Sequence, residues 1–266
     1  TCDREVVTEY SSTTSRAVIQ HDLTANSNVY ASLSEGFKAG GYATYECTEP
    51  YDPEEVTSIE FGFKGSLSEN TSLNASLFRY DYTDFQVLQV VGIQTVTRNA
   101  GDATVNGLEI EALSSINDSL SMNYGLTLLD ATYGEFLNTN GIQPQLGEQQ
   151  LDGNYLTNAP KVSINLGLNY SSPMASGASL TYRANAAYKS RIYFSEFNEY
   201  SQDAYTIVDL NLIWESADET LRSRFFIKNA TDEDYISGYL SSATGGGRFG
   251  QWGYPRTAGI EIQRNF

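Results

Sequence analysis

Apolar and polar residues alternate with a period of two in one long segment of this chain after another. In residues 58–67, SIEFGFKGSL, Phe61 and Phe63 alternate with Gly62 and Lys64. The same alternation recurs in LSMNYGLTL (120–128), VSINLGLNY (162–170) and IVDLNLIWES (207–216). Successive side chains of a strand point to opposite faces of its sheet, so these segments predict strands with one apolar and one polar face. The sequence therefore predicts an all-β chain.

The connections between these segments alternate in length. Short polar turns stand at 24–28, 68–72, 116–119, 172–177 and 215–220, and longer glycine-rich or acidic connections stand at 44–55, 91–96, 138–160, 198–205 and 243–253. A soluble β-sandwich has no reason to place short turns at one end and long loops at the other. A transmembrane barrel has this arrangement, with short periplasmic turns and long extracellular loops. The segments predict an antiparallel transmembrane β-barrel meander of about eleven strands, most of them longer than the roughly 10 residues that cross a bilayer.

The charged residues agree with one hydrated face of the strands and limit the kinds of partner that the chain can bind. Lys64, Arg183 and Arg224 stand mid-strand opposite apolar neighbours, where a packed core would demand a partner for each and a hydrated lumen would not. The 266 residues carry a formal net charge of −17, which repels phosphate backbones and argues against nucleic-acid binding. No apolar run reaches the roughly 18 residues of a membrane-spanning helix, so only strands would cross a membrane.

The odd strand count indicates a part of a larger barrel. Bacterial single-chain barrels have even strand counts, and an open sheet would leave two long unpaired edges. The chain opens on TCDREVV, without an initiating Met or a signal peptide. We therefore expect residues 1–266 to be a portion of a longer polypeptide, with further strands outside this chain.

Five motifs, in order along the chain, resemble those of TonB-dependent outer-membrane receptors. They are VYASLSEGFKAGGY (29–42), TRNAGDATVNGLEIEA (97–112), NAPKVSINLGLNY (158–170), FFIKNATDEDYISG (225–238) and GYPRTAGIEIQRNF (253–266). The likeness includes Asn99 and Gly101 in the second motif, Asn229 and Asp232 in the fourth, and the terminal Phe266. One such motif alone carries little weight, whereas five in family order span nearly the whole chain.

The resemblance implies a 22-stranded barrel whose lumen is closed by an N-terminal plug domain. Residues 1–266 would be the C-terminal part of that barrel, and the plug domain, the TonB-contacting segment and the first strands would lie outside this chain. The implied function is a receptor in the cell outer membrane that imports a scarce nutrient with energy from the TonB complex. A ferric siderophore is the commonest cargo in this family, and haem, cobalamin and oligosaccharides are the alternatives. Nothing in the sequence identifies ligand-contact residues.

Two strand ends follow from these motifs. We expect the strand that holds Ala31 and Leu33 on its lipid side to leave the bilayer after Ser34, with GFKAGGY at the outer interface. A final strand is expected over 259–266, with Ile260, Ile262 and Phe266 toward lipid and Arg264 on the same face by parity. The resemblance implies that the barrel-assembly machinery reads Phe266 as the aromatic terminus. Outer-membrane lipid would be the other partner of this strand.

The remaining candidate residues carry little chemistry. Cys2 and Cys47 would fall in outer loops that flank one hairpin, and export favours a disulfide between them, with two unpaired thiols as the alternative. His21 lacks the company for a catalytic or metal site, so we expect a protein that is not an enzyme and has no cofactor or resident metal. An acidic run is expected to be a solvated loop, with cation binding as the alternative. That run comprises Glu46, Glu49, Asp52, Glu54 and Glu55.

Two other functional classes compete with the receptor. A passive porin or structural barrel would have fewer strands, no plug and none of the motifs above. A soluble secreted all-β binding module would place Leu166, Leu168, Leu210 and Leu212 in a core between two sheets. The position of these side chains in the folded chain separates the soluble module from a membrane barrel.

Overall fold

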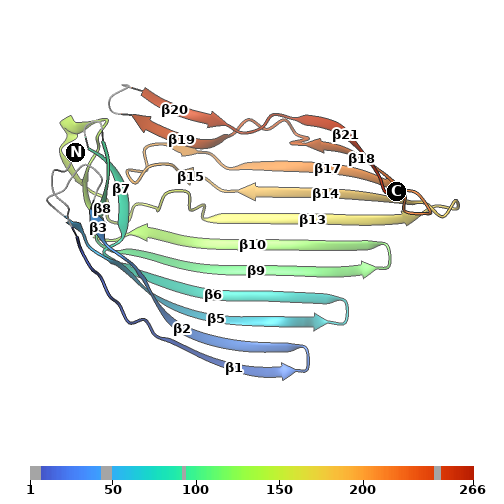
Figure 1. The fold of residues 1–266 in the computed structure, drawn as a ribbon, viewed down its shortest axis with the longest axis horizontal. Coiled ribbons are helices and arrows are strands. Elements are labelled where there is room, and N and C mark those ends of the chain that lie inside the picture. Colours follow the sequence, from blue (N-terminus) through green and yellow to red (C-terminus); the bar gives the residue numbers. More distant parts are fainter. Residues whose placement is uncertain (1–6, 43–49, 92–93, 243–246) are drawn as a thin grey trace.

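Eleven strands of the described residues form one antiparallel sheet in which each strand lies beside its neighbour in sequence (Figure 1). The computed structural model describes residues 7–42, 50–91, 94–242 and 247–266. The strands are β1 (Arg16–Thr24), β2 (Ser27–Lys38), β5 (Glu54–Ser68), β6 (Thr71–Thr83), β9 (Ala103–Asn117), β10 (Leu120–Tyr133), β13 (Val162–Pro173), β14 (Ser179–Lys189), β17 (Tyr205–Glu215), β18 (Leu221–Lys228) and β21 (Thr257–Arg264). The predicted all-β meander is confirmed. The alternative prediction, a sandwich of two packed sheets, is wrong.

The two ends of the sheet differ as the connection lengths predict. Tight turns join the strands at one end, and the long connections gather at the other (Figure 1). Five small hairpins stand in these loops: β3 (Gly41–Tyr42) with β4 (Pro50–Tyr51), β7 (Gln86–Val91) with β8 (Gln94–Asn99), β11 (Leu137–Thr139) with β12 (Glu148–Gln150), β15 (Ile192–Tyr193) with β16 (Ser201–Gln202), and β19 (Ile236–Ser242) with β20 (Gly247–Trp252). The predicted connections cover parts of these hairpins, and the hairpins themselves are an addition to that prediction.

One face of the sheet is apolar and open to its surroundings. Phe61 lies opposite Leu77 in the register, and Leu77 lies opposite Leu108, so the apolar residues form rows across the strands. The exposed fractions of Phe61, Leu166 and Ile260 are 56%, 47% and 72%. A soluble protein avoids a continuous apolar surface of this extent, whereas a lipid-facing sheet requires one.

The opposite face is polar. Lys64 lies opposite Asn74, and Asn74 lies opposite Glu111 on the next strand. The predicted assignment of faces is confirmed by the register, with Phe61, Leu166, Leu210 and Ile262 on the apolar face and Lys64, Asn165, Asp209 and Gln263 on the polar one. A hollow of about 590 Å³ beside Ile19 and Phe61 is lined almost wholly by apolar side chains, which suits lipid chains better than a polar ligand.

The apolar band has a sharp outer boundary. The row of Leu77, Leu108 and Leu128 is followed, two residues further along each strand, by Arg79, Asn106 and Asp130. In β10 the band runs from Leu120 to Leu128, which is about 26 Å along the strand at roughly 3.3 Å per residue. A tilt of about 40° reduces this to about 20 Å of height, close to the roughly 25 Å apolar band of outer-membrane barrels.

β2 continues further than its alternation predicts. The strand ends at Lys38, because its pairing with β5 persists to the pair of Lys38 and Glu54. Gly36 permits the extension, since a Cβ at this position would lie 2.7 Å from a methyl carbon of Val56 on the partner strand. Gly36, Phe37 and Lys38 thus belong to β2, and the position of GFKAGGY at the outer interface stays a prediction.

The well-buried apolar residues lie mostly at the loop end. The buried cluster comprises Ala100, Tyr133, Phe136 and Leu151, and Phe85, Val87, Leu156 and Phe197 pack against it. In the described ranges the one helical element is the short 3-10 turn η1 (Pro144–Leu146), and none of these residues forms a helix long and apolar enough to cross a membrane. Away from the sheet, the buried core of the described residues is therefore formed by loops that pack against one another.

Candidate functional site

The loops at the end of the sheet form a packed unit. Tyr133 at the end of β10 lies between Phe85 and Phe136, with ring centroids 6.3 and 5.4 Å away. Leu151 is 2% exposed and donates its backbone N–H to the carbonyl of Phe136. Aromatic pairs at such distances contribute roughly 0.5–1.5 kcal/mol each beyond the area that they bury. These contacts hold the loops against one another.

Gly101 allows the closest approach inside this unit. Its φ is +79°, and a Cβ there would lie 2.0 Å from the carbonyl oxygen of Glu135. The carbonyl of Gly101 accepts the backbone N–H of Phe85 at 2.7 Å, and the N–H of Ala100 donates to the carbonyl of Phe85 at 2.7 Å. Only glycine combines this conformation with this contact.

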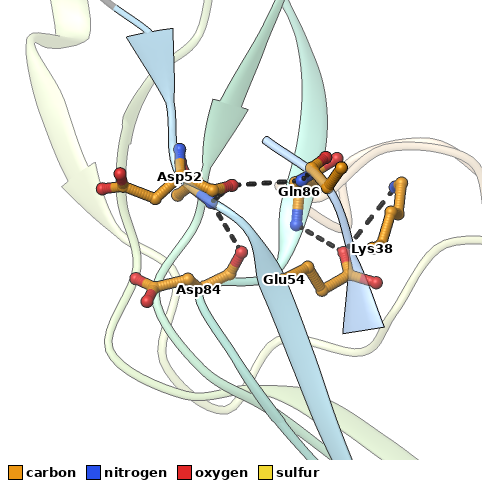
Figure 2. A network of polar contacts seen from close by, with 7 residues as sticks. Lys38, Asp52, Glu54, Asp84 and Gln86 are labelled. Atoms are coloured by element: carbon orange, nitrogen blue, oxygen red, sulfur yellow. Dashed lines mark hydrogen bonds and ion pairs between the residues drawn. The ribbon is translucent and has the colours of Figure 1, made fainter. Parts of the chain in front are cut away.

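A polar network ties the first loops together (Figure 2). The side-chain amide of Asn99 donates to the carbonyl oxygens of Asp52 and Asp84 at 2.9 and 2.7 Å, and its oxygen accepts the N–H of Asp52 at 2.7 Å. The N–H of Gln86 donates to the Glu54 carboxylate at 2.7 Å, and Lys38 Nζ lies 3.8 Å from the same oxygen. These bonds join the ends of β2 and β5 to the β7–β8 hairpin.

A cavity of about 270 Å³ opens between the β7–β8, β11–β12, β15–β16 and β19–β20 loops. Its aromatic wall is a column of three rings, in which Tyr239 from β19 lies 6.0 Å from Phe194 and 5.0 Å from Tyr200, stacked on both. Asn138 and Asn140 of the β11–β12 hairpin also line the cavity, together with Leu88, Leu240 and other residues. The site is therefore assembled from segments that are far apart in the chain.

The polar side of this cavity is acidic. Asn138 Nδ2 donates to the Glu196 carboxylate at 3.0 Å, and Asn140 Nδ2 donates to Glu199 at 3.0 Å. Burial raises the pKa of the Glu196 carboxyl above its ordinary value, and the charge of Glu199 raises it further. Both asparagines are buried, with exposed fractions of 6% and 5%. The carboxylates are held by amides rather than by cations.

A second polar cluster lies on the polar face of the sheet, away from the loops. Tyr30 donates its hydroxyl hydrogen to Glu60, and Lys64 Nζ lies 4.9 Å from the centre of the Tyr30 ring. Glu109 and Glu111 line the same hollow, which has a volume of about 280 Å³. Such a cluster is satisfied by water in a hydrated lumen, and it offers no nucleophile with a base.

The sequence of residues 3–230 matches the family described as TonB dependent receptor-like, beta-barrel. The chain belongs to this family. Its members are receptors of the Gram-negative outer membrane rather than enzymes. The apolar band and the sorted connections of this TonB-dependent receptor chain fit that membrane.

One curated relative and two solved structures illustrate the likeness. The ferric-pyoverdine 358 receptor of Pseudomonas putida is 25% identical over 280 residues, covering 99% of this chain and 30% of the relative. The ferric yersiniabactin uptake receptor FyuA from Yersinia pestis aligns with a TM-score of 0.78 at 20% identity, covering 94% of this chain and 37% of that one. The ferric preacinetobactin receptor BauA from Acinetobacter baumannii aligns with a TM-score of 0.72 at 21% identity, covering 94% and 36%. The chain thus spans about a third of the length of these proteins.

The predicted terminal residue lies at the short-turn end of the sheet (Figure 1). β21 spans Thr257–Arg264 rather than 259–266, because its partner β18 begins at Leu221, which lies opposite Arg264. Ile260 lies opposite Phe225, and Arg264 shares their face. The Arg264 guanidinium lies 5.1 Å from the centre of the fully exposed Phe266 ring. The assembly role of Phe266 stays a prediction.

Replacing Phe266 by Ala should lower the amount of receptor in the outer membrane to a minor fraction of the wild-type level. The physical reason is that the ring is fully exposed at the end of the sheet, where the assembly machinery can reach it. Quantitative immunoblots of outer-membrane fractions measure the effect. Tyr254→Ala, at another exposed ring, is the control. Normal levels of the Phe266 variant combined with lost ligand binding would show that the residue belongs to the transport site instead.

The other predicted residues have mixed outcomes. Cys2, Cys47, Glu46 and Glu49 lie outside the described residues, so the disulfide stays a prediction. His21 lies exposed on β1 at the edge of the sheet. Among the residues that the structure describes, no group of three or more His, Cys, Asp or Glu side chains is placed to hold a metal ion. Asp52 and Glu54 instead fasten the loops, through the bonds of Asn99 and Gln86.

Sequence reasoning missed the residues of the loop cavity. The segment 198–205 was predicted as a long connection, and Phe194 and Glu196 precede it without any pattern that singles them out. The nearest signal was the enrichment in Tyr and Phe, with 19 and 12 residues. Enrichment does not reveal which rings meet, because the stack joins residues about 40 positions apart.

Proposed function

We propose that this chain is the C-terminal part of the barrel of an outer-membrane receptor that imports a ferric siderophore with energy from TonB. In this proposal residues 1–266 form about half of a 22-stranded barrel, and a plug domain from elsewhere in the polypeptide closes the lumen. TonB acts through that other part of the protein. The barrel-assembly machinery inserts the receptor, and outer-membrane lipid covers the apolar face.

The match of residues 3–230 to the receptor barrel family carries the proposal. A passive porin does not account for that match. The loop end supports the proposal, because a preformed cavity with aromatic and amide groups is the kind of site that binds a small ligand. Tight turns join the strands at the opposite end of the sheet.

The names of the relatives support iron as the cargo. The Pseudomonas putida relative is a ferric-pyoverdine receptor, and the two aligned structures are receptors for ferric yersiniabactin and ferric preacinetobactin. These three ligands differ chemically but are all ferric siderophores. The shared cargo class is therefore the best-supported one for this chain.

Uptake of radioactive iron tests this function. We expect cells that express the complete receptor to accumulate iron-55 from one member of a panel of ferric siderophores, and we expect accumulation to vanish in a strain that lacks TonB. Surface binding of the same chelate should persist in that strain, because TonB supplies energy for transport rather than for binding. Uptake that continues without TonB would refute the proposal and favour a passive barrel. An absence of binding and uptake for every ferric chelate would refute iron as the cargo.

A further inference from the structure

The loop cavity combines an aromatic wall with one carboxylate, that of Glu196, which has no cationic partner among the described residues. Phe194, Tyr239 and Tyr200 present three stacked rings. Glu196 lines the cavity near them, and neither Glu196 nor Glu199 forms an ion pair with any residue that the structure describes. Aromatic faces and carboxylates both attract positive charge, so the two features select the same kind of group.

Two arginines of the described loops already have carboxylate partners. Arg191 Nη2 lies 2.7 Å from the Asp203 carboxylate, and Arg256 lies 3.0 Å from Asp232. No described Lys or Arg lines the cavity. Burial of a carboxylate without a positive partner is costly. A positive group that entered from outside would therefore remove a penalty that the free protein carries.

The cavity contains another polar group next to Glu196 in the sequence. Ser195 lines it, and its hydroxyl oxygen is shielded from solvent without a hydrogen-bond partner in the described part of the chain. Asn138 and Asn140 hold the two carboxylates in fixed positions. A planar cation with several N–H donors, such as an amidinium or guanidinium, uses such acceptors better than a spherical metal ion does.

We infer that the cavity beside Glu196 binds an organic cation, a guanidinium, amidinium or ammonium group carried by the imported ligand. Its ring system or alkyl stem lies against the column of Phe194, Tyr239 and Tyr200, and its N–H groups donate to Glu196. The site rejects groups with negative charge. The inference deepens the proposed receptor function and rests on it only for the statement that the cation belongs to the cargo.

A matched set of small aromatic probes tests the charge preference of the cavity. Benzamidinium, neutral benzamide and anionic benzoate share one ring and differ in charge. Binding of each to the detergent-solubilised complete receptor is measured by saturation-transfer NMR. We expect millimolar binding of benzamidinium, binding of benzamide about tenfold weaker, and none of benzoate.

Two variants locate the site. Glu196→Gln keeps the size of the side chain and an oxygen for the Asn138 amide, so the loops should stay in place while benzamidinium binding falls about tenfold and benzamide binding is unchanged. Glu148→Gln, an exposed loop carboxylate outside the cavity, is the control and should bind all three probes as wild type does. Equal binding of the three probes, no binding of any, or an unaffected Glu196 variant would overturn the inference.

The probe experiment needs neither iron nor TonB. Normal TonB-dependent uptake with no preference for benzamidinium would overturn the cation site and leave the receptor function standing. Charge-selective probe binding in a protein that fails to import any ferric chelate would refute the proposed iron uptake and retain the site itself.

Discussion

A Leu166→Arg substitution should sharply reduce the amount of receptor that folds into the membrane. Leu166 lies opposite Tyr124, which stands midway along the apolar band between Leu120 and Leu128. Its side chain is 47% exposed on the apolar face, so in a bilayer it contacts lipid. An arginine at the midplane of a lipid-facing strand costs about 2–4 kcal/mol. That is a shift on the order of 30- to 1,000-fold in the folding equilibrium.

The neighbouring residue is a matched control for this prediction. Asn165→Arg introduces the same charge one position away on the same strand, on the polar face. Its partners in the register, Gly125 and Ala187, are small and leave room for the longer side chain. Urea titrations of both variants folded into lipid vesicles compare their stabilities. If Asn165→Arg proves as harmful as Leu166→Arg, the assignment of lipid and lumen faces is wrong.

Gly101→Ala should disorder the outer loops while the sheet stays folded. The added Cβ would meet the carbonyl oxygen of Glu135 at 2.0 Å, a contact that backbone must relieve by moving. The positive φ adds a cost of about 1–2 kcal/mol for any residue with a side chain. The expected result is faster hydrogen exchange at Phe85, Ala100 and their neighbours, with a loss of ligand binding and normal exchange in the strands.

Gly153→Ala separates the effect of a close Cβ contact from the effect of the positive φ. Gly153 has a similar φ of +80°, but a Cβ there would have no atom within 4 Å. This variant should therefore show only the conformational cost and keep its binding. If the two alanine variants exchange and bind alike, the close packing of Gly101 against Glu135 does not order the loops.

These two predictions concern the two parts of the chain. One part is the membrane-spanning sheet, and the other is the packed unit of loops around Tyr133 and Phe136, which we call the cap. The sheet tolerates change on its polar face because water solvates that side. The cap tolerates little at its centre, since Ala100 and Leu151 are 1% and 2% exposed.

The sequence by itself determined the strands and their faces. Alternation places Phe61 and Lys64 on opposite sides wherever the strand lies, because the period of two is a local property of the extended chain. The lengths of the connections determined which end holds the loops. A tight turn makes the two strands that it joins pair in antiparallel fashion, so alternate connections lie at opposite ends of the sheet. The five motifs, which include Asn99 and Phe266, pointed to the receptor family because each is a short local stretch of sequence.

Only the tertiary structure decided which loop residues meet. Asn138, Glu196 and Tyr239 come from three connections, and no periodicity links them. Their convergence depends on how the loops pack around Tyr133 and Phe136, which is a property of the whole cap. The strand pattern could therefore be predicted from the sequence, whereas the cavity with the unpaired Glu196 carboxylate could not.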